Sequence, residues 1–177
     1  TIRAWSHVLT TEVYLMLALA SGALVLTTIL ALLGWPSPGA AWAAIVLLAL
    51  SALMKAIYWN GIDAAPRTFT VGSAVGLGAG TKVRPLLEAH TEANFVMREM
   101  GYRVARKHAD KLRLMVMAFA FAVPILLLVL LIAKPVLGPF AATLATISAG
   151  IGLFTERWLF FAEAQHVVTL YYGAARA

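Results

Sequence analysis

The sequence predicts an all-α integral membrane protein whose four transmembrane helices form two hairpins joined by a long basic loop. Four stretches carry no charged residue, namely 13–33, 39–54, 114–133 and 135–155. A helix needs roughly 20 mostly apolar residues to cross about 30 Å of hydrocarbon. Fourteen of the 22 charged residues fall instead within 63–113, between the second stretch and the third.

The composition excludes a soluble globular domain. Sixty-two percent of the residues are hydrophobic and 12% are charged, compared with about 25% charged residues in an average soluble domain. A secretory signal would account for only one of the four apolar stretches. The chain has no cysteine, so it supplies neither a Cys-ligated iron–sulfur cluster nor a disulfide. We therefore expect 1–177 to be a single membrane domain and, because it starts at Thr1 and not at Met, part of a longer protein.

The first hairpin is expected to consist of helices at 11–33 and 40–60. Thr11 is a suitable N-cap, because its side-chain oxygen can accept a bond from a free N–H of the first turn. A turn rich in proline and glycine separates the two helices. Trp42 at one end of the second helix and Trp59 at the other mark the expected depths of the membrane–water interfaces.

The second hairpin is expected to consist of helices at 112–133 and 140–165. Pro124 predicts a kink in the first of these helices, with a neighbouring helix satisfying the carbonyl that the proline leaves free. Gly150 and Gly152 give the other helix a face of small residues, which favours close contact between helices.

The polar loop at 63–111 determines the predicted topology. Its second part is expected to be helical from about Thr91, since Glu99 and Arg103 have a favourable i,i+4 spacing. Thirteen Lys and Arg residues fall on the side of this loop, and only Lys134 falls on the other side. The positive-inside rule therefore predicts a multi-pass protein of the bacterial inner (cytoplasmic) membrane, with the central loop and the C-terminus in the cytoplasm.

A cluster of basic residues leads from the loop into the third helix. Two explanations are ordinary ones, topology and attraction to anionic lipid headgroups, and a third is docking of an acidic partner subunit. No nucleic-acid or nucleotide partner is expected, because the Gly-rich stretch 72–82 matches neither a Walker motif nor a dinucleotide fingerprint. The candidate docking residues are Arg103, Arg106, Lys107, Lys111 and Arg113.

Charged residues near the ends of the second and fourth helices have two interpretations. The structural one is an ion pair between Lys55 and either Glu156 or Glu163, with Arg157 extending to the lipid headgroups. The functional one is a site for a quinone headgroup. Quinone reduction consumes protons as well as electrons, so such a site needs hydrogen-bond donors and a path to water. The candidate quinone-binding residues are Glu163, His166 and Tyr171.

No metal site, catalytic residue or haem is expected in this chain. Haem would need one histidine from each of two facing helices, whereas His90 and His108 lie in the predicted loop. The remaining possibility for haem ligation is a pair formed by His7 and His166 near one membrane interface.

Three stretches of the sequence resemble a known family. They are PLLEAHTEAN at 85–94, EMGYRVARKHADKLR at 99–113 and ERWLFFAEAQHVVTLYYG at 156–173. They are similar to the dimethyl sulfoxide reductase anchor-subunit family, most closely to its branch of sulfite dehydrogenase membrane anchors. The resemblance implies the C-terminal half of an eight-helix protein.

The resemblance also implies a function within a multi-subunit oxidoreductase. The chain would be the membrane anchor, and it would transfer electrons between an iron–sulfur subunit and membrane quinone (menaquinone or ubiquinone), in sulfite oxidation. The molybdopterin and the iron–sulfur clusters would belong to the partner subunits. Two alternatives are a purely structural anchor without quinone contact and half of a small-solute transporter.

Overall fold

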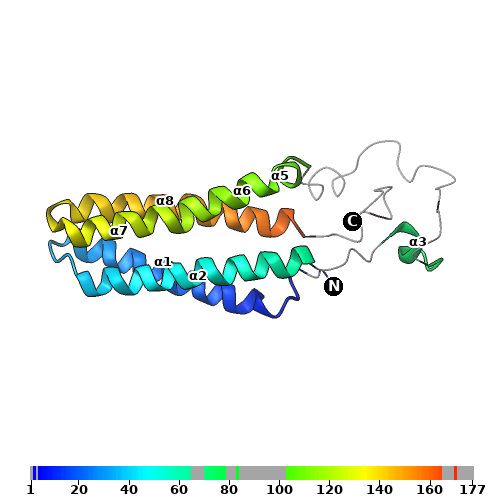
Figure 1. The fold of residues 1–177 in the computed structure, drawn as a ribbon, viewed down its shortest axis with the longest axis horizontal. Helices are drawn as coiled ribbons and strands as arrows, with labels where there is room; N and C mark the ends of the chain where they lie inside the picture. The colour runs from blue at the N-terminus through cyan, green and yellow to red at the C-terminus, as the bar shows by residue number, and fades with distance from the viewer. Residues whose placement is uncertain are drawn as a thin grey trace.

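The computed structural model describes residues 2, 4–64, 70–78, 83, 103–164 and 170, and every regular element among them is helical. Four helical segments are long and apolar enough to cross a membrane, as the sequence predicts. The elements are α1 (Leu9–Leu32), α2 (Pro38–Ala64), α3 (Val71–Ala74), α5 (Arg103–Lys107), α6 (Ala109–Val116), the π-helix η1 (Met117–Ala122), α7 (Val123–Ala133), the 3-10 helix η2 (Pro135–Leu137) and α8 (Gly138–Ala162) (Figure 1).

The four spans form a ring of neighbouring helices. α1 contacts α2 and α8, and α7 likewise contacts α2 and α8. α2 and α8 therefore lie diagonally opposite each other across the bundle. The short turns from α1 to α2 and from α7 to α8 lie together at one end of the bundle (Figure 1).

The turn after α1 follows from one glycine. Gly34 has a φ of 81°, a left-handed conformation that costs glycine no steric strain. This conformation lets the Trp35 N–H donate to the Leu30 carbonyl at 2.9 Å and the Gly34 N–H donate to the Ala31 carbonyl at 3.1 Å. Both bonds belong to a Schellman motif, so the carbonyls at the end of α1 are satisfied without water.

The sequence predicts a kink at Pro124 in the third span, and the structure has a π-helical segment directly before this proline. In η1 (Met117–Ala122) the Val123 N–H donates to the carbonyl of Ala118, five residues earlier. In the same register the N–H of residue 124 would donate to the Phe119 carbonyl, but residue 124 is a proline and has no N–H. Ser148 Oγ of α8 donates to the Phe119 carbonyl instead, at 2.8 Å, so the freed carbonyl is satisfied inside the membrane.

The same segment makes a very close contact with α8. A Cβ atom added to Gly152 of α8 would lie 2.2 Å from the backbone nitrogen of Ala120 and 2.6 Å from its Cα. Only a residue without a side chain fits there, because real Cβ atoms do not approach so closely. The buried alanines Ala142, Ala145 and Ala149 extend this small-residue face along α8, as in other closely packed membrane helices.

A buried hydroxyl pair connects α1 to α8 nearer the short turns. Thr28 Oγ1 lies 2.7 Å from Thr146 Oγ1 and 3.1 Å from the Ala142 carbonyl. Hydrogen bonds of this kind strengthen helix association where lipid provides no hydrophobic driving force between helices.

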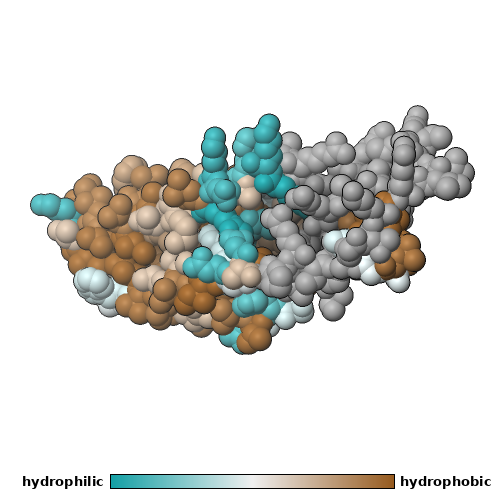
Figure 2. All heavy atoms as spheres, turned by 45° about the vertical axis from the view of Figure 1, so that its right-hand side comes forward, coloured by the Kyte–Doolittle hydropathy of each residue, from teal (hydrophilic) through white to brown (hydrophobic). Residues whose placement is uncertain are grey.

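The outer surface of the bundle is apolar. Large side chains such as Leu19, Leu126 and Phe154 point outward and are exposed. Figure 2 shows a hydrophobic surface along the helices, with hydrophilic side chains gathered towards one end of it. Such a surface suits hydrocarbon and not water.

Gly152→Ala is expected to destabilise the fold by about 1–3 kcal/mol, because the added methyl group would overlap the backbone of η1. The matched control is Gly150→Ala on the same helix, where an added Cβ meets nothing within 4 Å. Thermal unfolding in detergent, followed by circular dichroism, measures both variants. Equal melting temperatures for the two variants would contradict the close contact.

Candidate functional site at the polar end of the bundle

Charged and aromatic side chains gather where α2 and α8 approach their C-terminal ends, at the end of the bundle opposite the short turns. We call this region the polar end. On α2, Tyr58, Trp59 and Asp63 follow Lys55 by three, four and eight residues, so these side chains lie on one side of the helix. The polar end comprises Lys55, Tyr58, Trp59, Asp63, Arg113, Glu156, Arg157, Phe160 and Glu163.

The centre of the polar end is a buried ion pair between Lys55 and Glu156. The two residues are 1% and 0% exposed, and they belong to diagonally opposite helices, so the lysine side chain crosses the bundle axis. The lysine Nζ also lies 4.4 Å from the ring centre of Tyr58 and 5.0 Å from that of Trp59. These aromatic faces offset part of the loss of water around the ammonium group.

Glu156 has a second cationic partner, Arg157. The guanidinium of Arg157 lies over the ring of Tyr14 on α1, 3.7 Å from its centre, and 5.4 Å from the ring centre of Phe160. Its side chain is 29% exposed. The structure thus turns Arg157 towards Glu156, whereas the sequence-based interpretation extended it to the lipid headgroups.

Glu163 pairs with Arg113 and not with Lys55. Arg113 Nε donates to Glu163 Oε1 at 2.7 Å, and Arg113 Nη2 donates to Asp63 Oδ1 at 2.9 Å. One arginine therefore joins the ends of α2, α6 and α8. Burial raises the pKa of the Glu163 carboxyl above its ordinary value, and the charge of Arg113 opposes that rise. The Arg113 guanidinium also lies 5.3 Å from the ring centre of Trp59.

Arg106 secures the C-terminal end of α8. Its Nε donates to the Ala162 carbonyl and its Nη2 to the Ala164 carbonyl, each at 2.9 Å. A cation at this position satisfies free carbonyls and interacts favourably with the helix dipole. Burial lowers the pKa of the Arg106 guanidinium from its ordinary value, although an arginine stays charged after such a shift.

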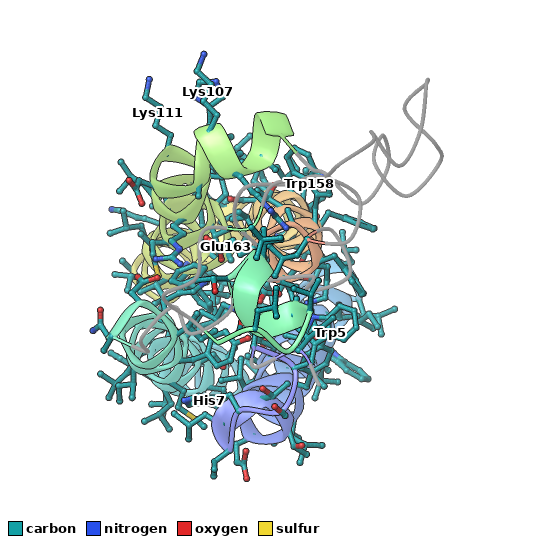
Figure 3. The ribbon with its side chains drawn as sticks, turned by 90° about the vertical axis from the view of Figure 1, so that its right-hand side faces the viewer. Trp5, His7, Lys107, Lys111, Trp158 and Glu163 are labelled. Carbon is teal, nitrogen blue, oxygen red and sulfur yellow. The ribbon has the colours of Figure 1, made fainter. Side chains whose placement is uncertain are left out.

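The predicted docking residues therefore do not act as one group. Arg106 and Arg113 bind carbonyls and carboxylates inside the chain, and their docking role stays a prediction. Lys107 and Lys111 are exposed and point away from the bundle (Figure 3). The side chain of Arg103 lies outside the described residues.

The N-terminal segment covers part of the polar end, a feature that the sequence analysis missed. The Ala4 carbonyl accepts hydrogen bonds from the Tyr58 hydroxyl at 2.9 Å and from Thr10 Oγ1 at 3.1 Å. Trp5 stacks on Phe160 with ring centres 6.2 Å apart. The signal in the sequence was Trp5 itself, an aromatic residue placed just before an apolar helix.

Of the three predicted quinone-binding residues, the structure places only Glu163, next to Arg113 and Asp63. His166 and Tyr171 lie outside the described residues, as does His90. Within the described part of the chain, no three His, Cys, Asp or Glu side chains are grouped so as to hold a metal ion.

Comparisons of the chain with family models, with curated proteins and with solved structures give no match. The resemblance to the anchor-subunit family therefore stays a prediction from the sequence.

Glu156→Gln is expected to destabilise the bundle by about 3–5 kcal/mol, because it leaves the buried Lys55 without its carboxylate. Lys55→Met should cost less, since Arg157 still neutralises Glu156. The double variant should recover most of the loss. Thermal unfolding in detergent gives the order of stability of the three variants. A double variant less stable than Glu156→Gln would contradict the prediction.

The pH dependence of stability is expected to change in Glu163→Gln. Since the folded-state pKa of Glu163 is raised, its contribution is fully present below the unfolded value of about 4.5 and is lost as pH rises through the folded-state pKa. Glu163→Gln has no carboxyl group to ionise at this position. As the pH rises over the interval just above 4.5, its melting temperature should therefore fall less than that of the wild type. Melting temperatures measured across that interval test this, with Glu12→Gln as the charge-matched control. Parallel curves for Glu163→Gln and the wild type would contradict it.

Proposed function

We propose that this chain is a membrane-anchor subunit of a molybdopterin oxidoreductase complex, in which it transfers electrons between an iron–sulfur subunit and membrane quinone during sulfite oxidation. The observation that supports this proposal most is the combination of four spanning helices with a dense group of charged and aromatic residues at one end. The resemblance of 85–94, 99–113 and 156–173 to the anchor-subunit family supplies the class of complex. The iron–sulfur clusters belong to the partner subunits, because this chain has no cysteine to ligate a cluster. The resemblance also assigns the molybdopterin to a partner subunit.

The quinone chemistry requires protons as well as electrons. Reduction of a quinone to a quinol takes up two electrons and two protons. The Glu163 side chain is 14% exposed, and its partner Arg113 also binds the exposed carboxylate of Asp63. This arrangement supports Glu163 as a group that exchanges protons with water near the membrane surface. His166 and Tyr171 follow it in the sequence and are proposed to complete the site for the menaquinone or ubiquinone headgroup.

The orientation belongs to the same proposal. The excess of Lys and Arg on the loop side supports a cytoplasmic polar end in the bacterial inner membrane. The partner subunits would then dock at the polar end, close to Glu163.

A second candidate is a purely structural anchor, and a specific observation favours it. Lys55 and Arg157 each form an ion pair with Glu156, and Glu163 is paired with Arg113. Groups paired in this way stabilise helix positions without a ligand.

His166→Ala and Glu163→Gln distinguish the two candidates. In the assembled complex each variant is expected to lower quinone-dependent turnover by about 100-fold, the usual effect of losing a proton-transferring group. Turnover with a soluble artificial acceptor, which takes electrons directly from the partner subunits, should stay unchanged. Glu12→Gln is the control on α1.

Unchanged quinone-dependent turnover in both variants, with the complex intact on size-exclusion chromatography, would leave only the structural anchor. A loss with both acceptors would assign the residues to assembly.

A further inference from the structure

The basic segment that enters the third span is divided into two kinds of cation. The inner arginines, Arg106 and Arg113, donate to carbonyls at the end of α8 and to the carboxylates of Glu163 and Asp63. The outer lysines, Lys107 and Lys111, are exposed. Figure 3 shows the two outer lysines side by side, both extending away from the bundle. Among the described side chains of this basic segment, the two lysines are therefore the cations available to a partner outside this chain.

The outer lysines lie where lipid headgroups are expected. Lys111 is in the first turn of the span Ala109–Ala133, and Lys107 is one turn earlier on the same side. The first turn of a spanning helix lies at the boundary between headgroups and hydrocarbon. Their positive charges thus occupy the depth of the phosphate groups.

An apolar strip continues directly below the outer lysines. Met115 and Phe119 follow Lys111 at intervals of four residues, and Leu114 lies beside them. All three side chains are exposed, Leu114 to 72%. A helix surface with cations above and apolar side chains below matches the two parts of a phospholipid, its phosphate and its acyl chains.

We infer that Lys107, Lys111 and the strip formed by Leu114, Met115 and Phe119 bind an anionic phospholipid. The two ammonium groups would contact the headgroup phosphate as point charges, and an acyl chain would lie along the strip. This site is independent of the proposed quinone chemistry, because none of these residues belongs to the polar end.

The arrangement favours a lipid over an acidic protein subunit. A soluble acidic partner would need the lysines but would not use apolar side chains that lie inside the span. The exposed Asp110 and His108 stand between the lysines in sequence. The Asp110 carboxylate would repel an acidic protein surface and a phosphate alike, so the apolar side chains below the lysines are what favours the lipid.

Native mass spectrometry of the purified protein in detergent tests this inference. The protein is titrated with dioleoylphosphatidylglycerol and, separately, with dioleoylphosphatidylcholine. Each lysine near an anionic headgroup is expected to strengthen binding about 5-fold. Lys107→Gln/Lys111→Gln should therefore weaken phosphatidylglycerol binding about 25-fold and leave phosphatidylcholine binding unchanged.

Two control variants separate the site from net charge and from folding. Lys134→Gln removes an exposed lysine at the opposite end of the same span and should change phosphatidylglycerol affinity less than 2-fold. Lys107→Arg/Lys111→Arg keeps both charges and should retain the affinity. Circular dichroism identifies any variant that fails to fold, in which case the single substitutions are compared, each with an expected 5-fold loss.

Equal phosphatidylglycerol affinity in the wild type and the double Gln variant would overturn the inference. So would equal affinities of the wild type for the two lipids. If the double variant kept its lipid affinity but no longer co-purified with soluble subunits, the lysines would serve a protein partner and the lipid site would be wrong.

Discussion

The bundle depends on one ion pair that crosses its axis. Lys55 and Glu156 are fully buried and lie on helices that are diagonally opposite in the bundle. In lipid no hydrophobic force holds helices together, and an unpaired buried charge costs several kcal/mol. The pair therefore fixes the rotation and depth of α2 relative to α8, since any displacement that separated the two groups would leave both charges in an apolar environment.

The remaining polar contacts follow from that constraint. With Lys55 used by Glu156, the next acidic residue along, Glu163, needs another cation, and Arg113 supplies it while also binding Asp63. With Arg106 and Arg113 turned inward, the exposed positive charge among the described side chains of this segment is that of Lys107 and Lys111. Between the polar end and the short turns the bundle uses a different means of association. There Gly152 lets two backbones approach, and a hydroxyl group satisfies a free carbonyl.

The sequence predicts the spanning helices well because uncharged stretches of about 20 residues have few other uses. It does not predict which acid binds Lys55, because Glu156 and Glu163 lie on the same face of an ideal helix about two turns apart. The depth of Lys55 relative to α8 decides between them, and that depth is fixed only by the packing of the helices. Pro124 indicates a disturbance in the third span, but the π-helical form depends on Ser148 and on Gly152 of another helix. The covering of the polar end by residues 4–8 has no periodic signal, since a short segment before a helix shows no amphipathic pattern.

Under the proposed function, these contacts limit which residues of the polar end could transfer a proton. Lys55 and Arg157 both pair with Glu156 inside the bundle, so removing any of these three charges would disturb how α2 and α8 are held relative to each other. Glu163 differs, because it lies at the end of α8, its partner Arg113 is shared with the exposed Asp63, and its side chain is partly exposed. A proton taken up there leaves Arg113 paired with Asp63, so the helix ends stay joined while the charge of Glu163 changes. Under the proposed function, Glu163 is therefore an acidic residue of the polar end that could act in proton transfer without loosening the bundle.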